Sequence, residues 1–170
     1  MTTKEERLEI VNNIIKKIAS VDRKFFYSRT NCLTAYMFFK NNRLYFKDEF
    51  TKRDIYAYGY KYFRYCSQGG TLQGLILDFS EYIRTGNYSD GKNGYGGLFC
   101  PHWGYSDEGM KAIQEYAVEL GYLNATLCGI CEKPIFQNEP SDKIPSGHEF
   151  FIVHSSCLPD CEEEEYDDGY

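Results

Sequence analysis

The chain lacks the features that mark membrane and secreted proteins. None of its 170 residues belongs to a run that approaches the roughly 18 apolar residues of a membrane-spanning helix. Residues 1–6 also lack the apolar segment of a secretory signal. We therefore expect a protein that makes no membrane contact and works in the cytoplasm.

Candidates for catalysis are also scarce. Only three histidines are present, and His102 alone lies outside the C-terminal cluster described below. No nucleophile and base can be assigned to its neighbourhood from the sequence. We therefore expect that the protein is not an enzyme.

Cysteine is plentiful, but the seven cysteines are an odd number and do not form a complete disulfide framework. Without an export signal we expect reduced thiols. Cys32, Cys66 and Cys100 stand apart from the other four, and we expect them to be small buried apolar side chains.

The net charge of −6 conceals a strong asymmetry. Residues 1–85 carry 15 Lys and Arg against 9 Asp and Glu, whereas residues 86–170 carry 4 against 16. Such a split is typical of a basic half that faces a polyanion or an acidic partner, and an acidic half that repels nucleic acid. The alternative is that the two halves attract each other. The acidic residues 162–170 are expected to form a disordered tail.

Three segments show the pattern of amphipathic helices. In residues 3–20, Thr3 and Glu6 form a capping box before an apolar stripe with helical spacing. Residues 71–86 and 106–121 form the other two, which begin at Thr71 and Ser106 and end at glycine. The predicted buried positions of these two helices are Leu72, Leu75, Ile76, Phe79, Ile83, Met110, Ile113, Ala117 and Leu120.

Residues 33–40, 43–48 and 54–60 are expected to form an antiparallel meander, with turns at residues 41–42 and 51–52. Strand alternation places one set of side chains in the core and leaves an aromatic and basic face. Exposed rings stack on bases while cations follow phosphates, so this face is a candidate for binding single-stranded nucleic acid. The alternative is that the rings cover core edges. The candidate residues are Arg43, Tyr45, Lys47, Lys52, Arg53, Tyr56, Tyr58, Lys61 and Arg64.

Two close pairs of soft ligands stand near the C-terminus: Cys128 with Cys131, and His154 with Cys157. Each pair can chelate one ion, and this donor set suits tetrahedral Zn²⁺. Four protein ligands leave no position for water, so we expect a structural zinc ion. His148 or Cys161 remains an alternative ligand.

The Cys-Gly-Ile-Cys-Glu-Lys-Pro-Ile run and the later His154-x-x-Cys157 pair resemble treble-clef zinc knuckles, especially the first finger of LIM domains. The resemblance covers about residues 126–161 and lacks a second finger. The first run also looks like the knuckle beside some HNH nucleases, but their catalytic histidine and asparagine positions are absent. The expected fold is α+β: an N-terminal helix packed on a three-stranded antiparallel meander, two further helices and a small treble-clef-like zinc knuckle. The body covers residues 1–123, the zinc knuckle 124–161 and the tail 162–170.

The segment Phe63 to Gly86, with Cys66-Ser67-Gln68-Gly69-Gly70-Thr71-Leu72, resembles small uncharacterised proteins of tailed bacteriophages. Trp103-Gly104-Tyr105 and residues 117–121 share this likeness, which ends near Leu123. The resemblance implies an accessory protein, in the host cytoplasm, that binds and modulates or inhibits a host defence or transcription complex by protein–protein contact. Its acidic half would occupy a cationic groove. The alternative functions are single-stranded nucleic-acid binding through the sheet face and metal-dependent hydrolysis, which requires a metal-bound water.

Overall fold

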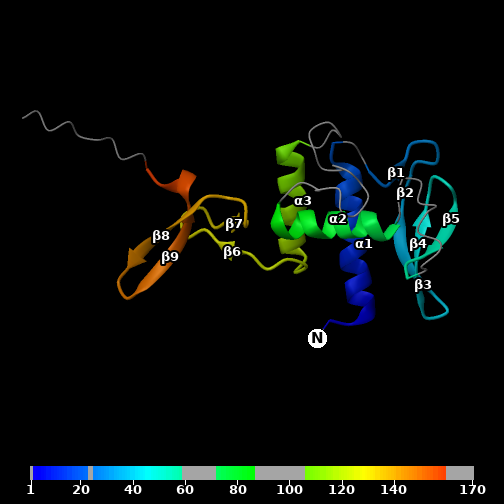
Figure 1. The fold of residues 1–170 in the computed structure, drawn as a ribbon, viewed down its shortest axis with the longest axis horizontal. Helices are drawn as coiled ribbons and strands as arrows, with labels where there is room; N and C mark the ends of the chain where they lie inside the picture. Colours follow the sequence, from blue (N-terminus) through cyan, green and yellow to red (C-terminus); the bar gives the residue numbers. More distant parts are fainter. Residues whose placement is uncertain (1, 23–24, 59–71, 87–105, 160–170) are drawn as a thin grey trace, which may run out of the picture. The chain divides into compact units, whose positions relative to one another are not determined.

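The computed structural model describes residues 2–22, 25–58, 72–86 and 106–159 (Figure 1). It divides into two compact units, Met1–Asn124 and Ala125–Tyr170. The described residues form α-helices and antiparallel sheets, which confirms the predicted α+β class. None of the helices in these ranges is long and apolar enough to cross a membrane.

Helix α1 (Lys4–Ser20) begins with the predicted capping box. The Glu6 amide donates to Thr3 Oγ1 at 3.1 Å, and the Thr3 amide donates to Glu6 Oε2 at 2.7 Å. Two N–H groups that the first helical turn leaves without partners are thereby satisfied. The last two turns bury Ile14, Ile15 and Ile18, so the apolar stripe faces the core.

The predicted meander is present as β3 (Tyr36–Lys40), β4 (Arg43–Asp48) and β5 (Arg53–Tyr56), in the order β3-β4-β5. The first predicted strand was too long at its start. Leu33 and Thr34 form a separate strand β2, which pairs with β1 (Tyr27–Ser28). The Ala35 amide donates to the Phe26 carbonyl at 2.9 Å, which extends this pairing by one residue before β3 begins.

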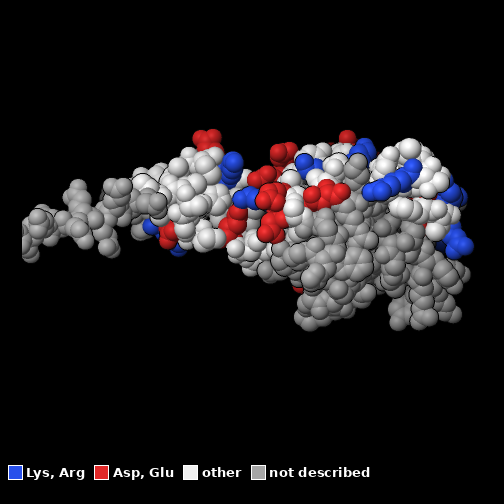
Figure 2. All heavy atoms as spheres, turned by 90° about the horizontal axis from the view of Figure 1, so that it is seen from above, with Lys and Arg blue, Asp and Glu red and all other residues white. Residues whose placement is uncertain are grey.

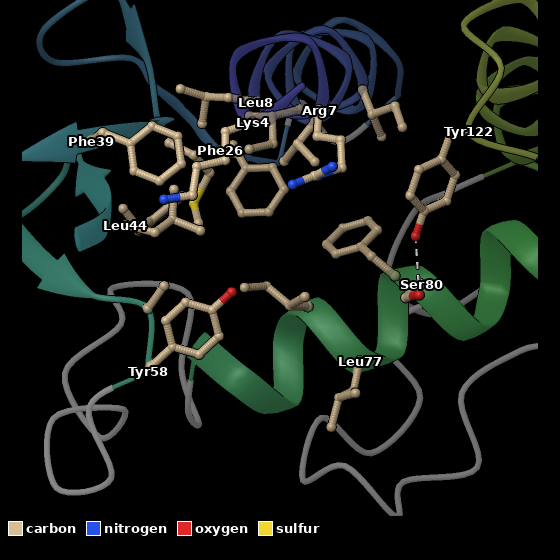
Figure 3. A pocket seen from close by; sticks show the side chains of 18 of the residues that line it. Lys4, Arg7, Leu8, Phe26, Phe39, Leu44, Tyr58, Leu77, Ser80 and Tyr122 are labelled. Atoms are coloured by element: carbon tan, nitrogen blue, oxygen red, sulfur yellow. Dashed lines mark hydrogen bonds between the residues drawn. The ribbon is translucent and has the colours of Figure 1, made fainter. Parts of the chain in front are cut away.

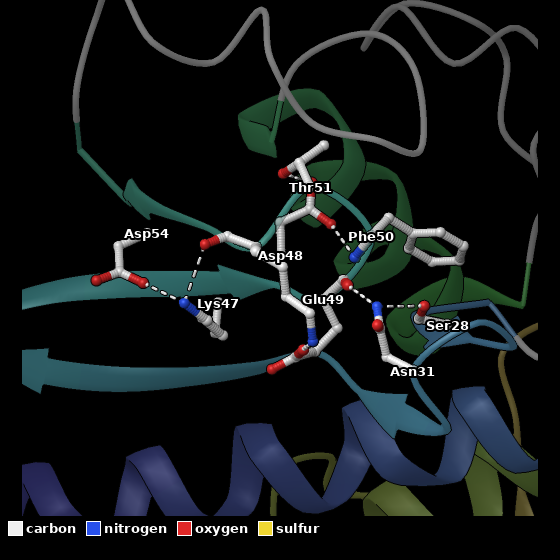
Figure 4. Close-up of polar contacts among 9 residues, drawn as sticks. Ser28, Asn31, Lys47, Asp48, Glu49, Phe50, Thr51 and Asp54 are labelled. Atoms are coloured by element: carbon white, nitrogen blue, oxygen red, sulfur yellow. Dashed lines mark hydrogen bonds and ion pairs between the residues drawn. The ribbon is translucent and has the colours of Figure 1, made fainter.

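The two turns of the meander form in different ways, the first through its backbone conformation and the second through side-chain bonds. Asn41 and Asn42 both have positive φ, as a two-residue hairpin turn requires. In the β4–β5 turn, buried Asp48 accepts from the Phe50 amide at 3.1 Å and the Thr51 hydroxyl at 3.0 Å (Figure 4). Both predicted turns are therefore confirmed, and the second depends on a buried carboxylate.

Helices α2 (Leu72–Thr85) and α3 (Asp107–Glu119) complete the N-terminal unit. The predicted end of α2 is confirmed, since Gly86 has φ +69°. Ser106 caps α3 by accepting from the Gly109 amide at 3.0 Å. Ile76 was expected to be buried but is 42% exposed, whereas Tyr82 is 4% exposed, because the buried side of α2 is rotated toward Tyr82.

The core of the N-terminal unit is built around packed aromatic rings. Phe26 lies 5.1 Å from Phe25, 5.3 Å from Phe79 and 5.9 Å from Phe46 between ring centroids. These distances are those of edge-on and tilted aromatic pairs. The rings join the segment after α1 to the sheet and to α2, so one cluster holds the three parts together.

Within residues 125–159, the C-terminal unit forms two hairpins and one helical turn. Strands β6 (Thr126–Leu127) and β7 (Pro134–Ile135) form the first hairpin, and β8 (Ser141–Ser146) and β9 (Glu149–His154) form the second. The 3₁₀ turn η3 (Ser155–Cys157) follows β9 directly. The second hairpin therefore ends in a strand that runs directly into a short helical turn at His154.

The prediction that Cys32 is buried is wrong, because its side chain is exposed. It lies in the β1–β2 turn with φ +53°, where the left-handed backbone turns the side chain away from the core. Cys66 and Cys100 lie outside the described residues, as do Thr71, the segment 87–104 and the acidic tail. The four described cysteines, at positions 32, 128, 131 and 157, are free thiols.

Candidate metal centre and aromatic sheet face

The first cysteine pair lies in the tight turn between β6 and β7. The Cys128 amide donates to the Lys133 carbonyl at 2.9 Å, and the Glu132 amide donates to the Cys128 carbonyl at 3.0 Å. Glu132 has φ +59°, which lets the chain reverse directly after Cys131. These bonds form a knuckle, residues 128–133, that carries two thiols on one turn.

The second ligand pair comes from the end of the other hairpin. His154 is the last residue of β9, and Cys157 ends the 3₁₀ turn η3. The two hairpins meet here, since the Gly129 amide donates to the Ile152 carbonyl at 3.0 Å. A Cβ at position 129 would lie 3.1 Å from the Phe151 Cβ, so glycine permits this close approach.

Four ligand atoms converge between the hairpins. The Sγ atoms of the three cysteines and one ring nitrogen of His154 all lie within 4.8 Å of one another. His154 Nδ1 is 3.5 Å from Cys131 Sγ and 3.9 Å from Cys157 Sγ. Ligands bound to one zinc ion at about 2.0–2.3 Å would be separated by about 3.3–3.8 Å in a tetrahedron. The donor set therefore fits a tetrahedral metal ion with only small movements.

Two groups behind His154 fix the orientation of its ring. Nε2 lies 3.2 Å from the Pro134 carbonyl oxygen and 3.4 Å from Glu139 Oε2. Glu139 is itself held by the Phe136 amide, which donates to the same oxygen at 3.0 Å. A proton on Nε2 satisfies these acceptors and leaves Nδ1 free to bind a metal, which is how metal-ligating histidines are oriented.

The electrostatics of the cluster favour one thiolate. Burial by itself would raise the pKa of Cys128, but hydrogen bonds from the Cys131, Ile130 and His154 amides outweigh it and lower the pKa to about 6. The hydrogen bond with Cys131, burial and the neighbouring Cys128 sulfur raise the pKa of Cys157 to about 11. Three ionised sulfurs repel one another at this separation, and a divalent cation removes that cost.

Of the two alternative ligands, His148 is not part of this cluster. His148 lies in the turn between β8 and β9, at the opposite end of the hairpin from His154. Cys161 lies outside the described residues. The Cys₃His cluster can bind a metal ion with the four residues singled out from the sequence.

The outer face of the meander carries a row of aromatic rings. Ring centroids are 5.8 Å apart between Phe38 and Tyr45, 5.5 Å between Tyr45 and Tyr56, and 6.1 Å between Tyr56 and Tyr58. Tyr36 extends the row, 5.7 Å from Phe38. Strand register produces the row, because Phe38 pairs with Tyr45 and Tyr45 with Tyr56. Phe38 was not among the predicted residues, although its alternation with Met37 in the sequence could have identified it.

For binding nucleic acid, the predicted cations are placed less favourably than the rings. Lys47 Nζ lies 2.9 Å from Asp54 Oδ1, and Lys52 forms an ion pair with buried Glu49 (Figure 4). Arg43 stays on the ring face, 5.8 Å from the centroid of Tyr56. Arg53 pairs with Asp48 in register and therefore projects from the other face. Lys61 and Arg64 lie outside the described residues.

On the face of the N-terminal unit that Figure 2 shows, side chains of opposite charge gather over different elements. Acidic side chains gather where α3 lies, and basic side chains lie over the sheet (Figure 2). Asp107 and Glu108, in the first turn of α3, are exposed and complement the helix dipole. The charge asymmetry of the sequence is thus already present within this unit.

The exposed apolar side chains of the C-terminal unit were not predicted. Phe150 is 68% exposed, Phe151 50% and Ile130 52%. Strand alternation places Phe150 and Phe151 on opposite faces of the β8–β9 hairpin, with Phe151 against Gly129 of the knuckle. We define these three residues, which lie on both sides of the hairpin, as the knuckle apolar surface. Two adjacent aromatic residues in a six-residue strand of a small unit were the only sequence signal that could have indicated it.

The chain was compared with known proteins. A model of the YoqU family matches residues 2–138. The SPbeta prophage-derived uncharacterized protein YoqU of Bacillus subtilis (strain 168) is 33% identical over 120 residues, which are 69% of this chain and 83% of that protein. No solved structure matches the chain significantly. The expected end of the likeness near Leu123 is wrong, because the family match includes Cys128 and Cys131; His154 and Cys157 lie beyond it.

Proposed function

Because this chain belongs to the YoqU family, a family with a member derived from a prophage, we propose that it is a phage accessory protein without catalytic activity. It binds a host macromolecular complex, in the host cytoplasm, and modulates or inhibits it by protein–protein contact. A structural zinc ion in the C-terminal unit holds the binding surface in shape. The observation that carries this proposal is the knuckle apolar surface beside the Cys₃His cluster.

The zinc ion would be held by Cys128, Cys131, Cys157 and His154. A zinc ion bound there would cross-link the two hairpins. Protein atoms would fill all four of its usual coordination positions. A hydrolytic function would need an open position for water, which these four donors do not leave. The donor set therefore favours a structural role over a catalytic one.

The knuckle apolar surface has the composition of a binding site. Phe150, Phe151 and Ile130 leave half or more of their surface in contact with water, which is unfavourable in a unit this small. Aromatic side chains of this kind are typical anchors in protein–protein interfaces. The knuckle and β9 are joined by the Gly129–Ile152 hydrogen bond, so the surface moves as one body.

The test uses the variant I130T/F150T/F151T, in which threonine retains strand propensity while the apolar area is removed. We expect wild-type protein to capture a specific host protein from Bacillus subtilis lysate. With that partner purified, the triple variant should bind about thirtyfold or more weakly, since interface anchors each contribute about 2 kcal/mol or more.

Leu33→Thr is the matched control, because Leu33 is 49% exposed but belongs to the N-terminal unit. It should bind the same partner with unchanged affinity. The metal content of all three proteins should be equal, which shows that the variants are folded. Equal affinity of wild-type protein and the triple variant would eliminate the knuckle apolar surface as the contact.

The aromatic row on the sheet favours a second candidate, binding of single-stranded nucleic acid. Tyr58 is 73% exposed, and Arg43 stands beside Tyr56, so a base and a phosphate can both be contacted. The ion pairs of Lys47 and Lys52 remove two cations from this face, and for that reason we place this function second.

Fluorescence anisotropy with an oligo(dT) strand at several salt concentrations tests this candidate. If the face binds, the affinity should fall with salt, with a slope of about −0.7 for each phosphate neutralised. R43A/Y58A should then weaken binding about tenfold or more, since each stacked base contributes about 1–3 kcal/mol. The control Lys143→Ala, in the C-terminal unit, should have no effect. Absence of binding at low salt would reject this function.

A further inference from the structure

A cavity of about 780 Å³ lies inside the N-terminal unit, between α1, the meander and α2 (Figure 3). This volume is within the range of small-molecule sites. The mouth of the cavity reaches the end of the aromatic row, because Arg43, Tyr56 and Tyr58 also line it. Its inner walls are made of nearly buried apolar side chains: Ile14, Ile18, Met37, Phe46, Phe79 and Ile83.

One end of the cavity is positively charged. Lys4, Arg7 and Arg43 line it, and none of the described lining residues is acidic. Figure 3 shows the side chains of Lys4 and Arg7 reaching from α1 into the space between α1, the sheet and α2. Because the described lining contains these three cations and no carboxylate, the site attracts an anion.

The contacts of these cations with described residues are to neutral groups. Lys4 Nζ donates to Asn42 Oδ1 at 3.0 Å and lies 5.6 Å from the Phe39 ring centroid. Arg7 donates to the Thr2 carbonyl at 2.6 Å. All three cations are exposed, so a bound anion gains their charge without first breaking an ion pair to any residue that the structure describes.

The rim away from the charged end is apolar and open. Ile76 is 42% exposed and Leu77 46%, and both line the cavity from α2. Beyond them, the hydroxyl groups of Ser80 and Tyr122 lie 3.1 Å apart and are hydrogen-bonded to each other. A ligand that follows this wall therefore meets apolar surface along most of its length.

We propose that this cavity binds a long-chain acyl carboxylate. The carboxylate lies among Lys4, Arg7 and Arg43, and the alkyl chain lies along the apolar walls that α1, the sheet and α2 provide. Charge complementarity selects an anion over a cation of equal length, and the apolar walls select a long chain over a short one. This site is independent of the proposed contact through the knuckle apolar surface.

Isothermal titration of the full chain with straight-chain carboxylates of 8 to 16 carbons, below their micelle concentrations, tests the proposal. Affinity should rise with length, by roughly fifteenfold for each two methylene groups that are fully buried in the cavity. The alkyltrimethylammonium of the same length should bind at least tenfold more weakly than the carboxylate. Equal affinity of the two head groups, or no binding by any chain length, would overturn the proposal.

Two variants locate the ligand. K4E/R7E should weaken binding of the carboxylate by roughly tenfold to a hundredfold, because two charge-assisted contacts are replaced by repulsion. Lys16→Glu is the control, since Lys16 is exposed on α1 but does not line the cavity. Leu77→Glu should weaken binding as well, by placing a charge on the apolar wall.

Circular dichroism of each variant shows whether it is folded. Equal binding by wild-type protein, K4E/R7E and Leu77→Glu would place the ligand elsewhere and overturn the proposal. Binding only to phosphatidylglycerol vesicles, or only to an acidic helical peptide, would also overturn it, because the occupant would then be a membrane or a protein.

Discussion

Replacing Cys128 by serine should remove the metal from the C-terminal unit and unfold that unit, while the N-terminal unit stays folded. Among residues 125–159, the buried hydrophobic residues are Cys128, Phe136 and Val153. So small a core does not compensate for the conformational entropy of the unit. Structural zinc contributes about 10–16 kcal/mol of apparent binding free energy in comparable small units. Its loss should therefore unfold the C-terminal unit.

The comparison is made by zinc analysis and by NMR of the full chain. We expect one zinc ion per chain in the wild type and less than a tenth of that in Cys128→Ser. Amide resonances of residues 125–159 should collapse to unfolded positions, and those of α1 should not move. Cys32→Ser is the control, because Cys32 is exposed and lies in the other unit. Retention of the fold by Cys128→Ser would contradict a structural metal.

Replacing Phe46 by alanine should destabilise the N-terminal unit and leave the C-terminal unit folded. Phe46 is 2% exposed, lies on the core side of β4 and packs against Phe26. Truncation of such a residue leaves a cavity and costs about 3–5 kcal/mol of unfolding free energy. The N-terminal unit should therefore unfold at a lower urea concentration, while the zinc content stays at one per chain.

The control for this variant is Leu33→Ala, at an exposed position of β2. It should change the unfolding free energy by about 0.5 kcal/mol or less. Urea unfolding monitored by circular dichroism measures both variants. A loss of zinc together with the loss of structure in Phe46→Ala would show that the two units do not fold independently.

Local signals predicted most of the elements. The capping box at Thr3, the asparagine pair at positions 41–42 and the serine cap at position 106 act within a few residues, so the sequence displays them directly. Leu33–Thr34 was assigned to β3 because β-propensity continues through it. Its pairing with β1 depends on a contact with residues 27–28 that no local pattern displays.

The metal cluster was accessible to prediction because its ligands are rare residue types at chelating spacing. The groups that orient His154 were not, because Glu139 and the Pro134 carbonyl reach the ring only after the two hairpins fold together. The cavity between α1, the meander and α2 escaped prediction for a similar reason. Its walls consist of ordinary core positions, and only the tertiary arrangement leaves space between them.

Ile76 illustrates how a periodic pattern can mislead. Its spacing from Leu72 and Phe79 fits a buried helical stripe, but α2 is rotated so that Tyr82 takes the buried position. Periodicity gives the width of an apolar stripe, whereas its centre is set by the partner surfaces. Ile76 lines the cavity instead of packing in the core.

X-ray absorption at the zinc edge of the purified full chain tests the central claim most directly. The claim is that a saturated metal site shapes the C-terminal unit for binding. We predict one zinc ion per chain with three sulfur ligands at about 2.3 Å and one nitrogen ligand at about 2.0–2.1 Å. A spectrum that requires a bound water, or fewer than three sulfur ligands, would contradict the account.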